Sequence, residues 1–418
     1  MSVRVLIISN EFCCGSSSNG RTLMNMLKGF KPENLAQFAI HGQVDQDFCS
    51  HSFKVSDKDA LNAFLGRKPK KTPSSSSSHT KGQEKKVVAR NYRNLVFRDI
   101  VWKSYRWWNK EFTGFIENFN PKIIIFQAGD SPFMFNIARR IAKKYALPIV
   151  MYNSENYVLK KQIYNSNEKN NFWHFLLQKF LKNEYKKMMD VASFCIYSTE
   201  YLEESYQKVY PHPNKSTTIY TVTDMQNCAI NNESKPFSLL YCGNLGVGRV
   251  YPLDELAKTL AKVDTNAKLH VYGKFTDQES QQVLCQNKNV EYGGLIPYSE
   301  LPEKIKQASI VVHAENPERL QNLMGAFSTK IADCLACGKP FLVYASRDYP
   351  FVKYLEKNNA AHVAENTKEL ENVLANCIAD TEYRNKYLQN AQNLAKENHC
   401  LDKTSQKTQR ILKTILQD

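Results

Sequence analysis

Short apolar runs alternate along this chain with longer stretches of helical periodicity. Runs of roughly four to eight apolar residues indicate buried strands, and apolar positions with a period near 3.6 indicate amphipathic helices. In the first half, the predicted strands are Val3–Ser9, Phe38–Gly42, Lys122–Gln127, Pro148–Tyr152 and Phe194–Ser198. The predicted helices between them are Arg21–Phe30, Tyr92–Phe119, Phe133–Tyr145, Phe172–Met188 and Glu200–Val209. Such alternation is typical of parallel β-α-β units.

The second half repeats the pattern. Its predicted strands are Phe237–Cys242, Lys268–Tyr272, Val290–Tyr292, Ile310–His313 and Phe341–Tyr344, and its last predicted helices are Tyr383–Glu397 and Lys403–Leu416. A chain of 418 residues is too long for one typical core, so two α/β domains are expected. The segment at about 67–86 contains five consecutive Ser among many charged residues, which predicts a disordered insertion.

Composition excludes several classes of protein. A hydrophobic content of 42% excludes a disordered chain, and no apolar run approaches the ~20 residues of a membrane-spanning helix. The start, MSVRVLIISN, predicts a buried strand, because no cleavage site follows it. Eleven Cys at irregular spacing fit a reducing cytoplasm. Cys334 and Cys337 lie in one predicted helix without a second pair at zinc spacing, so no metal site is expected.

The formal charge is +15, and cations cluster between Arg67 and Arg106. Such a field favours anionic membranes, anionic glycolipids or nucleic acid, although a merely soluble basic protein is the alternative. Between Arg90 and Phe112, cations alternate with aromatic residues, including Trp102, Trp107 and Trp108. This stripe is expected either to rest on an anionic membrane or to pack in the first domain's core.

Two segments of the second half carry candidate chemistry. FSTKIADCLACGKP, from Phe327 to Pro340, predicts a helix whose first turn offers Ser328, Thr329 and Lys330 to an anion. The alternative is an ordinary amphipathic helix capped by Ser328. YCGNLGVGR, from Tyr241 to Arg249, predicts a strand and a glycine loop that lets the backbone approach a phosphate. Arg249 is either a phosphate ligand or a surface residue.

The segment FSTKIADCLACGKP resembles the donor-sugar segment of retaining glycosyltransferases of family four (glycosyl transferases group 1). Its Ser-Thr-Lys form is similar to the branch that builds bacterial capsule and exopolysaccharide. The family's usual pattern is a Glu, seven residues and a second Glu. Here Asp333 stands at the second acid, and Gly325 stands where the first Glu would fall. The resemblance implies an α/β protein of GT-B fold, with two doubly wound Rossmann-like domains facing a cleft.

Implied domain bounds are 1–218 for the acceptor-binding domain and 219–395 for the nucleotide-sugar-binding domain. The resemblance also implies that residues 396–418 form a C-terminal helix that packs back on the first domain. No cofactor and no metal are implied, since GT-B enzymes typically stabilise the leaving phosphate with fixed positive groups.

The resemblance also assigns the donor site. Asn244 holds the position of the family's Arg, and Arg249 holds that of its Lys, so Arg249 and Lys330 would form the cationic pair on the pyrophosphate. Asp333 would accept hydrogen bonds from the ribose, and Glu315 and Glu318 would lie near the sugar hydroxyls. The remaining donor-side candidates are Gly243, Gly246, Lys274, Ser328, Thr329 and, through their backbone in a base-binding turn, Leu295 and Ile296.

Acceptor-side candidates come from the first half. Ser18, Asn19 and Gly20 resemble the loop that swings near the donor. Asp130 follows a predicted strand and is expected either to cap the next helix or to face the cleft. Asn153 and Glu155 stand where many family members have a His. Of these, Asp130 and Glu155 are the catalytic candidates beside Arg249 and Lys330.

Together these features predict a cytoplasmic retaining glycosyltransferase, peripheral to the inner face of the membrane. Its donor would be a nucleoside-diphosphate sugar of the UDP or GDP type, and its acceptor a lipid-linked saccharide. A non-catalytic GT-B subunit that supports a partner enzyme is the alternative. A nucleic-acid-binding protein is disfavoured, because no recognised module accompanies the charge.

Overall fold

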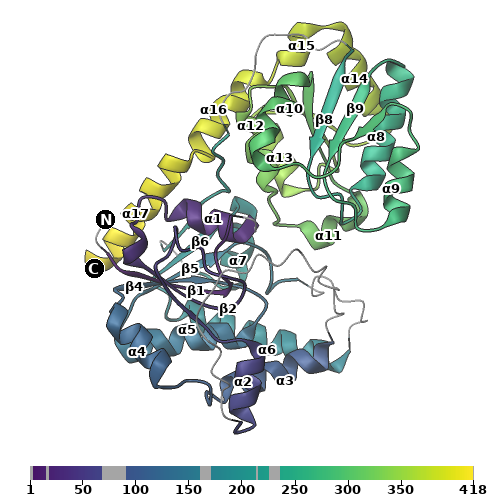
Figure 1. Ribbon diagram of the computed structural model, residues 1–418. Helices are drawn as coiled ribbons and strands as arrows, with labels where there is room; N and C mark the ends of the chain where they lie inside the picture. Colours follow the sequence, from purple (N-terminus) through teal and green to yellow (C-terminus); the bar gives the residue numbers. More distant parts are fainter. Residues whose placement is uncertain are drawn as a thin grey trace. The chain divides into compact units, whose positions relative to one another are not determined.

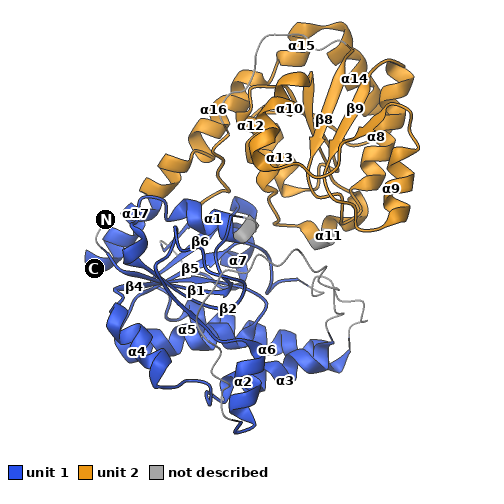
Figure 2. Ribbon diagram, viewed as in Figure 1, with its two compact units in different colours: residues 1–218, 407–418 blue, residues 219–406 orange. Residues whose placement is uncertain are grey.

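The computed structural model describes residues 3–15, 18–67, 91–160, 171–212, 215–225 and 236–417, without the side chains of residues 18, 19, 321 and 322. The disordered insertion predicted at about 67–86 lies, apart from its first residue, outside this description. The chain divides into two compact units (Figure 2). Unit 1 comprises Met1–Thr218 and Lys407–Asp418, and unit 2 comprises Ile219–Gln406.

Unit 1 is built on a seven-stranded parallel sheet of order β3-β2-β1-β4-β5-β6-β7 (Figure 1). The strands are β1 Val5–Glu11, β2 Leu35–His41, β3 His51–Lys54, β4 Ile123–Gln127, β5 Ile149–Asn153, β6 Phe194–Tyr197 and β7 Ser216–Thr218. The central strands are apolar except at their carboxyl ends, because helices cover both faces of a parallel sheet. The helices are α1 Ser18–Met26, α2 Asp57–Phe64, α3 Tyr92–Lys103, α4 Lys110–Phe119, α5 Pro132–Tyr145, α6 Phe172–Met189 and α7 Glu200–Val209, with a 3-10 turn at Pro32–Asn34.

The single helix predicted from Tyr92 to Phe119 is wrong, because the structure has two helices there. α3 ends at Lys103, and Tyr105 adopts a left-handed conformation with φ of 56°. Asn109 then caps α4, its side chain accepting the N–H of Phe112 at 2.9 Å. A good N-cap residue inside an apolar stretch was the missed signal.

The Trp stripe belongs to the core of unit 1. Trp102 is fully buried and stacks on Phe133, with ring centroids 4.8 Å apart. Trp107 is buried against Phe38 at 5.7 Å, and Trp108 is partly buried beside it. The core alternative is therefore confirmed for Trp102 and Trp107, and the expectation that they rest on a membrane is wrong.

Unit 2 contains a six-stranded parallel sheet of order β10-β9-β8-β11-β12-β13. The strands are β8 Ser238–Cys242, β9 Lys268–Tyr272, β10 Val290–Tyr292, β11 Ile310–Ala314, β12 Phe341–Tyr344 and β13 His362–Ala364. The helices are α8 Val250–Val263, α9 Gln278–Cys285, α10 Leu301–Gln307, α11 Leu320–Leu323, α12 Thr329–Ala336, α13 Pro350–Lys357, α14 Thr367–Ala379, α15 Thr381–Asn385 and α16 Leu388–Asn398, with 3-10 turns at Tyr298–Glu300 and Pro317–Arg319.

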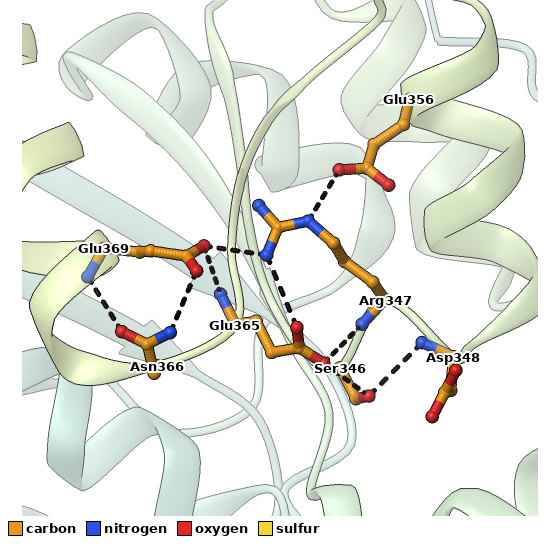
Figure 3. A network of polar contacts seen from close by, with 7 residues as sticks. All are labelled: Ser346, Arg347, Asp348, Glu356, Glu365, Asn366 and Glu369. Carbon is orange, nitrogen blue, oxygen red and sulfur yellow. Dashed lines mark hydrogen bonds and ion pairs between the residues drawn. The ribbon is translucent and has the colours of Figure 1, made fainter.

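An exposed network of polar contacts surrounds Arg347 in the loop between β12 and α13 of unit 2 (Figure 3). Arg347 donates to Glu356 of α13 at 2.9 Å and to Glu369 of α14 at 2.8 Å, and it pairs with Glu365 at 3.4 Å. One guanidinium thus links two helices to the loop between β12 and α13. This cluster of carboxylates serves structure, since Glu356, Glu365 and Glu369 all contact the guanidinium of Arg347.

The last helix, α17, spans Leu401–Gln417, and its residues from Lys407 onward are part of unit 1. Lys407 Nζ donates there to the backbone oxygen of Thr218 at 2.8 Å. Within the described ranges, no helix combines the length and apolar character that crossing a bilayer requires.

Candidate functional site

The loop after β8 and the first turn of α12 meet in unit 2. Gly243 follows β8, and the side chain of Lys330 lies directly against it. A Cβ atom at position 243 would fall 2.0 Å from Lys330 Cε, so a larger residue there would displace the end of this lysine side chain. The carboxyl ends of parallel strands are where doubly wound sheets bind ligands. The structure therefore brings together two residues that sequence reasoning assigned to one phosphate site from separate motifs.

α12 begins at Thr329, with Ser328 as its N-cap residue. Ser328 has the extended backbone of an N-cap, but its side chain makes no capping hydrogen bond to a described residue. The first-turn N–H groups of Thr329 and Lys330 lie at the positive end of the helix dipole, where an anion is stabilised. The alternative of an ordinary helix capped by the Ser328 hydroxyl lacks its capping bond.

Lys330 carries a desolvated charge. Its pKa is lowered to about 8, chiefly by burial and then by the nearby charge of Arg249, while Glu315 and Asp333 act in the opposite direction. The amine is therefore close to its two expected site partners, Arg249 and Asp333. An enclosed cation that has lost hydration gains more from a phosphate than an exposed one.

Arg249 is held by Glu315, which directly follows β11. Its Nε donates to Glu315 Oε1 at 2.9 Å, and Nη2 contacts the same oxygen. The two side chains are only 11% and 5% exposed. The surface alternative for Arg249 is therefore wrong, because its guanidinium lies in a largely buried ion pair.

Glu315 itself is poised by its surroundings. Burial would raise its pKa, but His313, whose Nε2 lies 3.2 Å away, and Arg249 outweigh this and hold the pKa below its ordinary value. Burial also lowers the pKa of His313. Within the described part of the chain, Glu315 Oε2 has no hydrogen-bond partner. Glu315 thus fixes Arg249 with one oxygen and keeps the other for a donor.

Asp333 is buried on α12 and is held by its own chain. It accepts from the Tyr298 hydroxyl at 2.9 Å and from the Thr223 hydroxyl. The Tyr298 hydroxyl also lies 3.2 Å from Asp224. Asp333 is therefore not a solvated acid on the surface of the helix. Thr223 and Tyr298 were missed as site neighbours because Thr223 lies 110 positions from Asp333 and no local motif links them.

The other donor-side candidates occupy loops around this centre. Asn244 Oδ1 accepts the N–H of Gly246 at 2.9 Å, which shapes the glycine loop. The predicted base-binding turn contacts the loop after β9, since Gly273 N donates to Gly294 O at 2.8 Å, and the glycine loop contacts the end of β9 through Gly243 N, which donates to Tyr272 O at 2.7 Å. Leu295 is 75% exposed there. Ile296 is half-buried, and Lys274 is exposed.

A second group of charges follows β4 and β5 in unit 1. Lys160 Nζ lies 3.8 Å from Glu155 Oε2, with the two side chains 10% and 37% exposed. Burial raises the pKa of Glu155 and lowers that of Lys160, and Asp130 contributes charge to both. The structure therefore brings Asp130 and Glu155 together and adds Lys160, which sequence reasoning missed because it lies outside every motif.

Asp130 does not cap α5. Ser131 is the N-cap residue of that helix, and its hydroxyl donates to Asp130 Oδ1 at 3.2 Å. The capping alternative for Asp130 is therefore wrong.

Asn153, an acceptor-side candidate, is 1% exposed and accepts the Tyr185 hydroxyl at 3.1 Å. Its Oδ1 atom thus contacts the interior of unit 1, and its acceptor-side role stays a prediction. Ser18, Asn19 and Gly20 open helix α1 instead of forming a loop, and the first two side chains are outside the description.

Comparison with known proteins agrees with this architecture. Residues 252–410, most of unit 2, match the family model described as glycosyl transferase-like, which is less than half of the chain. No curated protein sequence gave a significant match.

Among the described residues, no group of three or more His, Cys, Asp or Glu is arranged to hold a metal ion.

Three solved structures are similar over nearly the whole chain. HepE of Anabaena, in complex with UDP and glucose, has a TM-score of 0.63 at 12% identity, covering 99% of this chain and 100% of HepE. Sucrose-phosphate synthase of Thermosynechococcus elongatus has a TM-score of 0.63 at 11% identity, covering 99% of each chain. TarM, known from S. aureus, also gives 0.63 at 11% identity, covering 98% of this chain and 99% of TarM.

These likenesses define a GT-B protein of the α/β class, with two Rossmann-like domains, as the sequence predicted. The predicted resemblance to GT-B glycosyltransferases is thereby confirmed.

Proposed function

We propose that this protein is a retaining glycosyltransferase that transfers a sugar from a UDP or GDP sugar to a lipid-linked saccharide. The observation that carries the proposal is the enclosed amine of Lys330, lying against Gly243 at the start of α12 with Arg249 nearby. That HepE binds UDP and glucose supports a nucleotide-sugar donor. The product would enter capsule, exopolysaccharide or another cell-surface glycan, made at the inner face of the membrane.

The chemistry follows from the charges. Breaking the anomeric carbon–oxygen bond places negative charge on the departing phosphate. Lys330, Arg249 and the first N–H groups of α12 would stabilise that charge as it develops, without a metal ion. In a retaining reaction on one face, the leaving phosphate assists removal of the acceptor proton. The Asp130, Glu155 and Lys160 group would then orient the acceptor hydroxyl.

Donor binding tests the proposal directly. UDP, GDP and their sugar derivatives are screened by thermal shift, and the best ligand is measured by calorimetry with the wild type and Lys330→Ala. Losing this charge-assisted contact should weaken binding by ~1.5–3 kcal/mol, between about tenfold and about a hundredfold. Lys288→Ala, which removes an exposed cation just before β10 and outside every candidate site, is the matched control. Equal affinity of wild type and Lys330→Ala would remove Lys330 from the site.

Metal independence has its own test. Sugar transfer should continue in EDTA, because fixed cations meet the leaving charge. Complete loss of transfer in EDTA, with recovery on adding manganese, would contradict this part of the proposal.

A non-catalytic GT-B subunit is the second candidate. Gly325 at the position of the first Glu, and Asn244 at the position of an Arg, favour it. Release of the nucleotide from a bound sugar donor distinguishes the two. A catalyst releases UDP or GDP with acceptor or slowly with water, whereas a supporting subunit binds the donor and leaves it intact.

A further inference from the structure

Unit 1 exposes large apolar side chains on two neighbouring helices. Phe172 and Phe175 on α6 are each 67% exposed, and Phe97 and Ile100 on α3 are 49% and 51% exposed. Trp173 is 37% exposed and packs on Phe172 at 5.5 Å. Elsewhere in unit 1, large aromatic residues such as Trp102 lie in the core. Exposed apolar groups gathered in one region usually mark a contact surface.

The two helices form one continuous region, since they pack side by side in the same direction. Tyr92 near the start of α3 contacts His174 near the start of α6, with ring centroids 4.8 Å apart. At the other end, Lys103 Nζ pairs with Glu184 at 3.2 Å. The outward residues of α6 recur at helical spacing, so Phe172, Phe175, Lys179 and Lys182 lie along one side of it.

The charges of this region have one sign. Among the described residues of α3 and α6, every exposed charged side chain is a cation: Arg93, Lys179, Lys182, Lys186 and Lys187. The two acids of these helices, Asp99 and Glu184, are buried and paired with cations. We name Phe97, Ile100, Phe172, Trp173 and Phe175, with these five cations, the α3–α6 surface.

We propose that the α3–α6 surface docks on an anionic lipid bilayer, with its aromatic side chains at the level of the headgroups and its lysines on the anionic lipids. This inference rests on the proposed function, because docking on the bilayer would bring the site to a lipid-linked acceptor. The aromatic side chains involved differ from the Trp residues that sequence periodicity suggested.

Charge decides between lipid and protein as the occupant. Interfaces between proteins are depleted of Lys, whereas an anionic membrane attracts each nearby cation by about 1 kcal/mol. Phe and Trp partition favourably into the bilayer interface beside such cations. An apolar surface without charges would suit a protein partner. The α3–α6 surface, whose exposed charged side chains are all cations, suits an anionic lipid bilayer.

Flotation of the full chain with vesicles tests the proposal. The wild type should bind vesicles of phosphatidylglycerol and phosphatidylcholine, and bind pure phosphatidylcholine weakly. The double variant Phe172→Ser/Phe175→Ser should lose about tenfold or more in affinity, because each Phe loses its apolar insertion. The matched control is Val191→Ser/Val209→Ser, which removes two apolar residues of unit 1 that are 52% and 54% exposed outside this surface. It should bind like the wild type.

Two further experiments separate the contribution of the lysines from that of the aromatic side chains. Lys179→Gln/Lys182→Gln should reduce binding about tenfold at low salt, with a smaller difference at high salt. The fluorescence of Trp173 should shift to shorter wavelength on vesicle binding, and Trp173→Phe should abolish that change. Melting temperatures of all variants should stay near that of the wild type, because the replaced side chains are exposed.

The proposal is overturned if the wild type ignores anionic vesicles at low salt, or if Phe172→Ser/Phe175→Ser binds them unchanged. A wild-type dimer that this double variant dissociates would assign the surface to a second copy of the chain and also overturn it. Calorimetry of UDP and GDP keeps the two proposals distinct. Vesicle binding without nucleotide binding would leave the surface standing and remove the enzyme assignment.

Discussion

The proposed donor side in unit 2 and the proposed acceptor side in unit 1 lie on similar parallel sheets, yet their charged groups are held very differently. In unit 2, Glu315 and Arg249 form an ion pair whose side chains are only 5% and 11% exposed, and the side chain of Lys330 lies directly against Gly243. In unit 1, Glu155 is 37% exposed and lies 3.8 Å from Lys160. We expect the proposed donor side to be the more rigid of the two before any ligand binds, because its charged pair is closer and more buried.

The proposed reaction gives this difference a reason. Every nucleoside-diphosphate donor presents the same pyrophosphate, so fixed cations at one place are effective for all of them. Acceptor saccharides vary, and a looser pair of charges can adapt to different hydroxyl positions. Buried charge pairs and exposed ones should also differ in how much protein stability is lost when one partner is replaced.

Replacing Glu315 by Gln should destabilise the protein most. The change leaves Arg249 without its buried partner, which costs about 3–5 kcal/mol in the free energy of unfolding. Because the pKa of Glu315 is lowered in the fold, its contribution is complete at neutral pH. It is lost only as the pH falls from the ordinary value of 4.5 through the lower folded pKa.

Urea unfolding measures the effect of Glu315→Gln, with Glu155→Gln in unit 1 as the control. The half-exposed Glu155 should change stability by less than about 1 kcal/mol. Similar losses in the two variants would contradict the contrast between a rigid and a loose side.

The pH dependence of donor binding should follow Lys330. Burial lowers its pKa to about 8, so the free protein loses this charge above pH 8 and UDP or GDP should bind up to about tenfold more weakly per pH unit. Stability should change in the opposite direction. Between pH 8 and 10.5 the unfolded chain retains a proton that the folded one has released, so stability should rise with pH in that window.

Calorimetry across pH 7 to 10 measures this binding, and Lys330→Arg is the informative variant, since Arg keeps its charge throughout. If wild type and Lys330→Arg gave the same pH profile, the dependence would come from another group.

On the acceptor side, Lys160→Met should alter turnover while leaving donor binding intact. Removing the cation leaves Glu155 less stabilised as a carboxylate, so its pKa, already raised by burial, should rise further. The rate of UDP or GDP release with acceptor should then fall by about tenfold near neutral pH and recover toward higher pH. Lys160→Arg should restore the wild-type profile. A Lys160→Met profile identical to the wild type would limit Lys160 to a structural role.

Sequence reasoning predicted the long central strands and the two-domain order, because buried parallel strands are apolar on both faces. It missed β3, β7 and β13, which are short, and it merged α3 with α4, whose boundary depends on one capping residue. At the donor site it placed Lys330 and Gly243 from local motifs. It did not find the contact of Asp333 with Thr223, or that of Glu155 with Lys160, because pairs outside a motif are set by tertiary packing.

The smallest expected effect comes from the network around Arg347, which contains several carboxylates and has no proposed chemistry (Figure 3). Arg347 contacts Glu356, Glu365 and Glu369, but its side chain is 39% exposed. Solvent screens such pairs, so Arg347→Ala should lower the free energy of unfolding by at most about 1 kcal/mol, and less in 1 M salt. Donor affinity should not change. Comparing this loss with that of Glu315→Gln tests whether burial sets the size of the loss. The exposed network has more ion pairs than the donor side, so a count of ion pairs would predict the opposite order. A loss for Arg347→Ala as large as that for Glu315→Gln would mean that the number of ion pairs, and not their burial, sets the rigidity of unit 2.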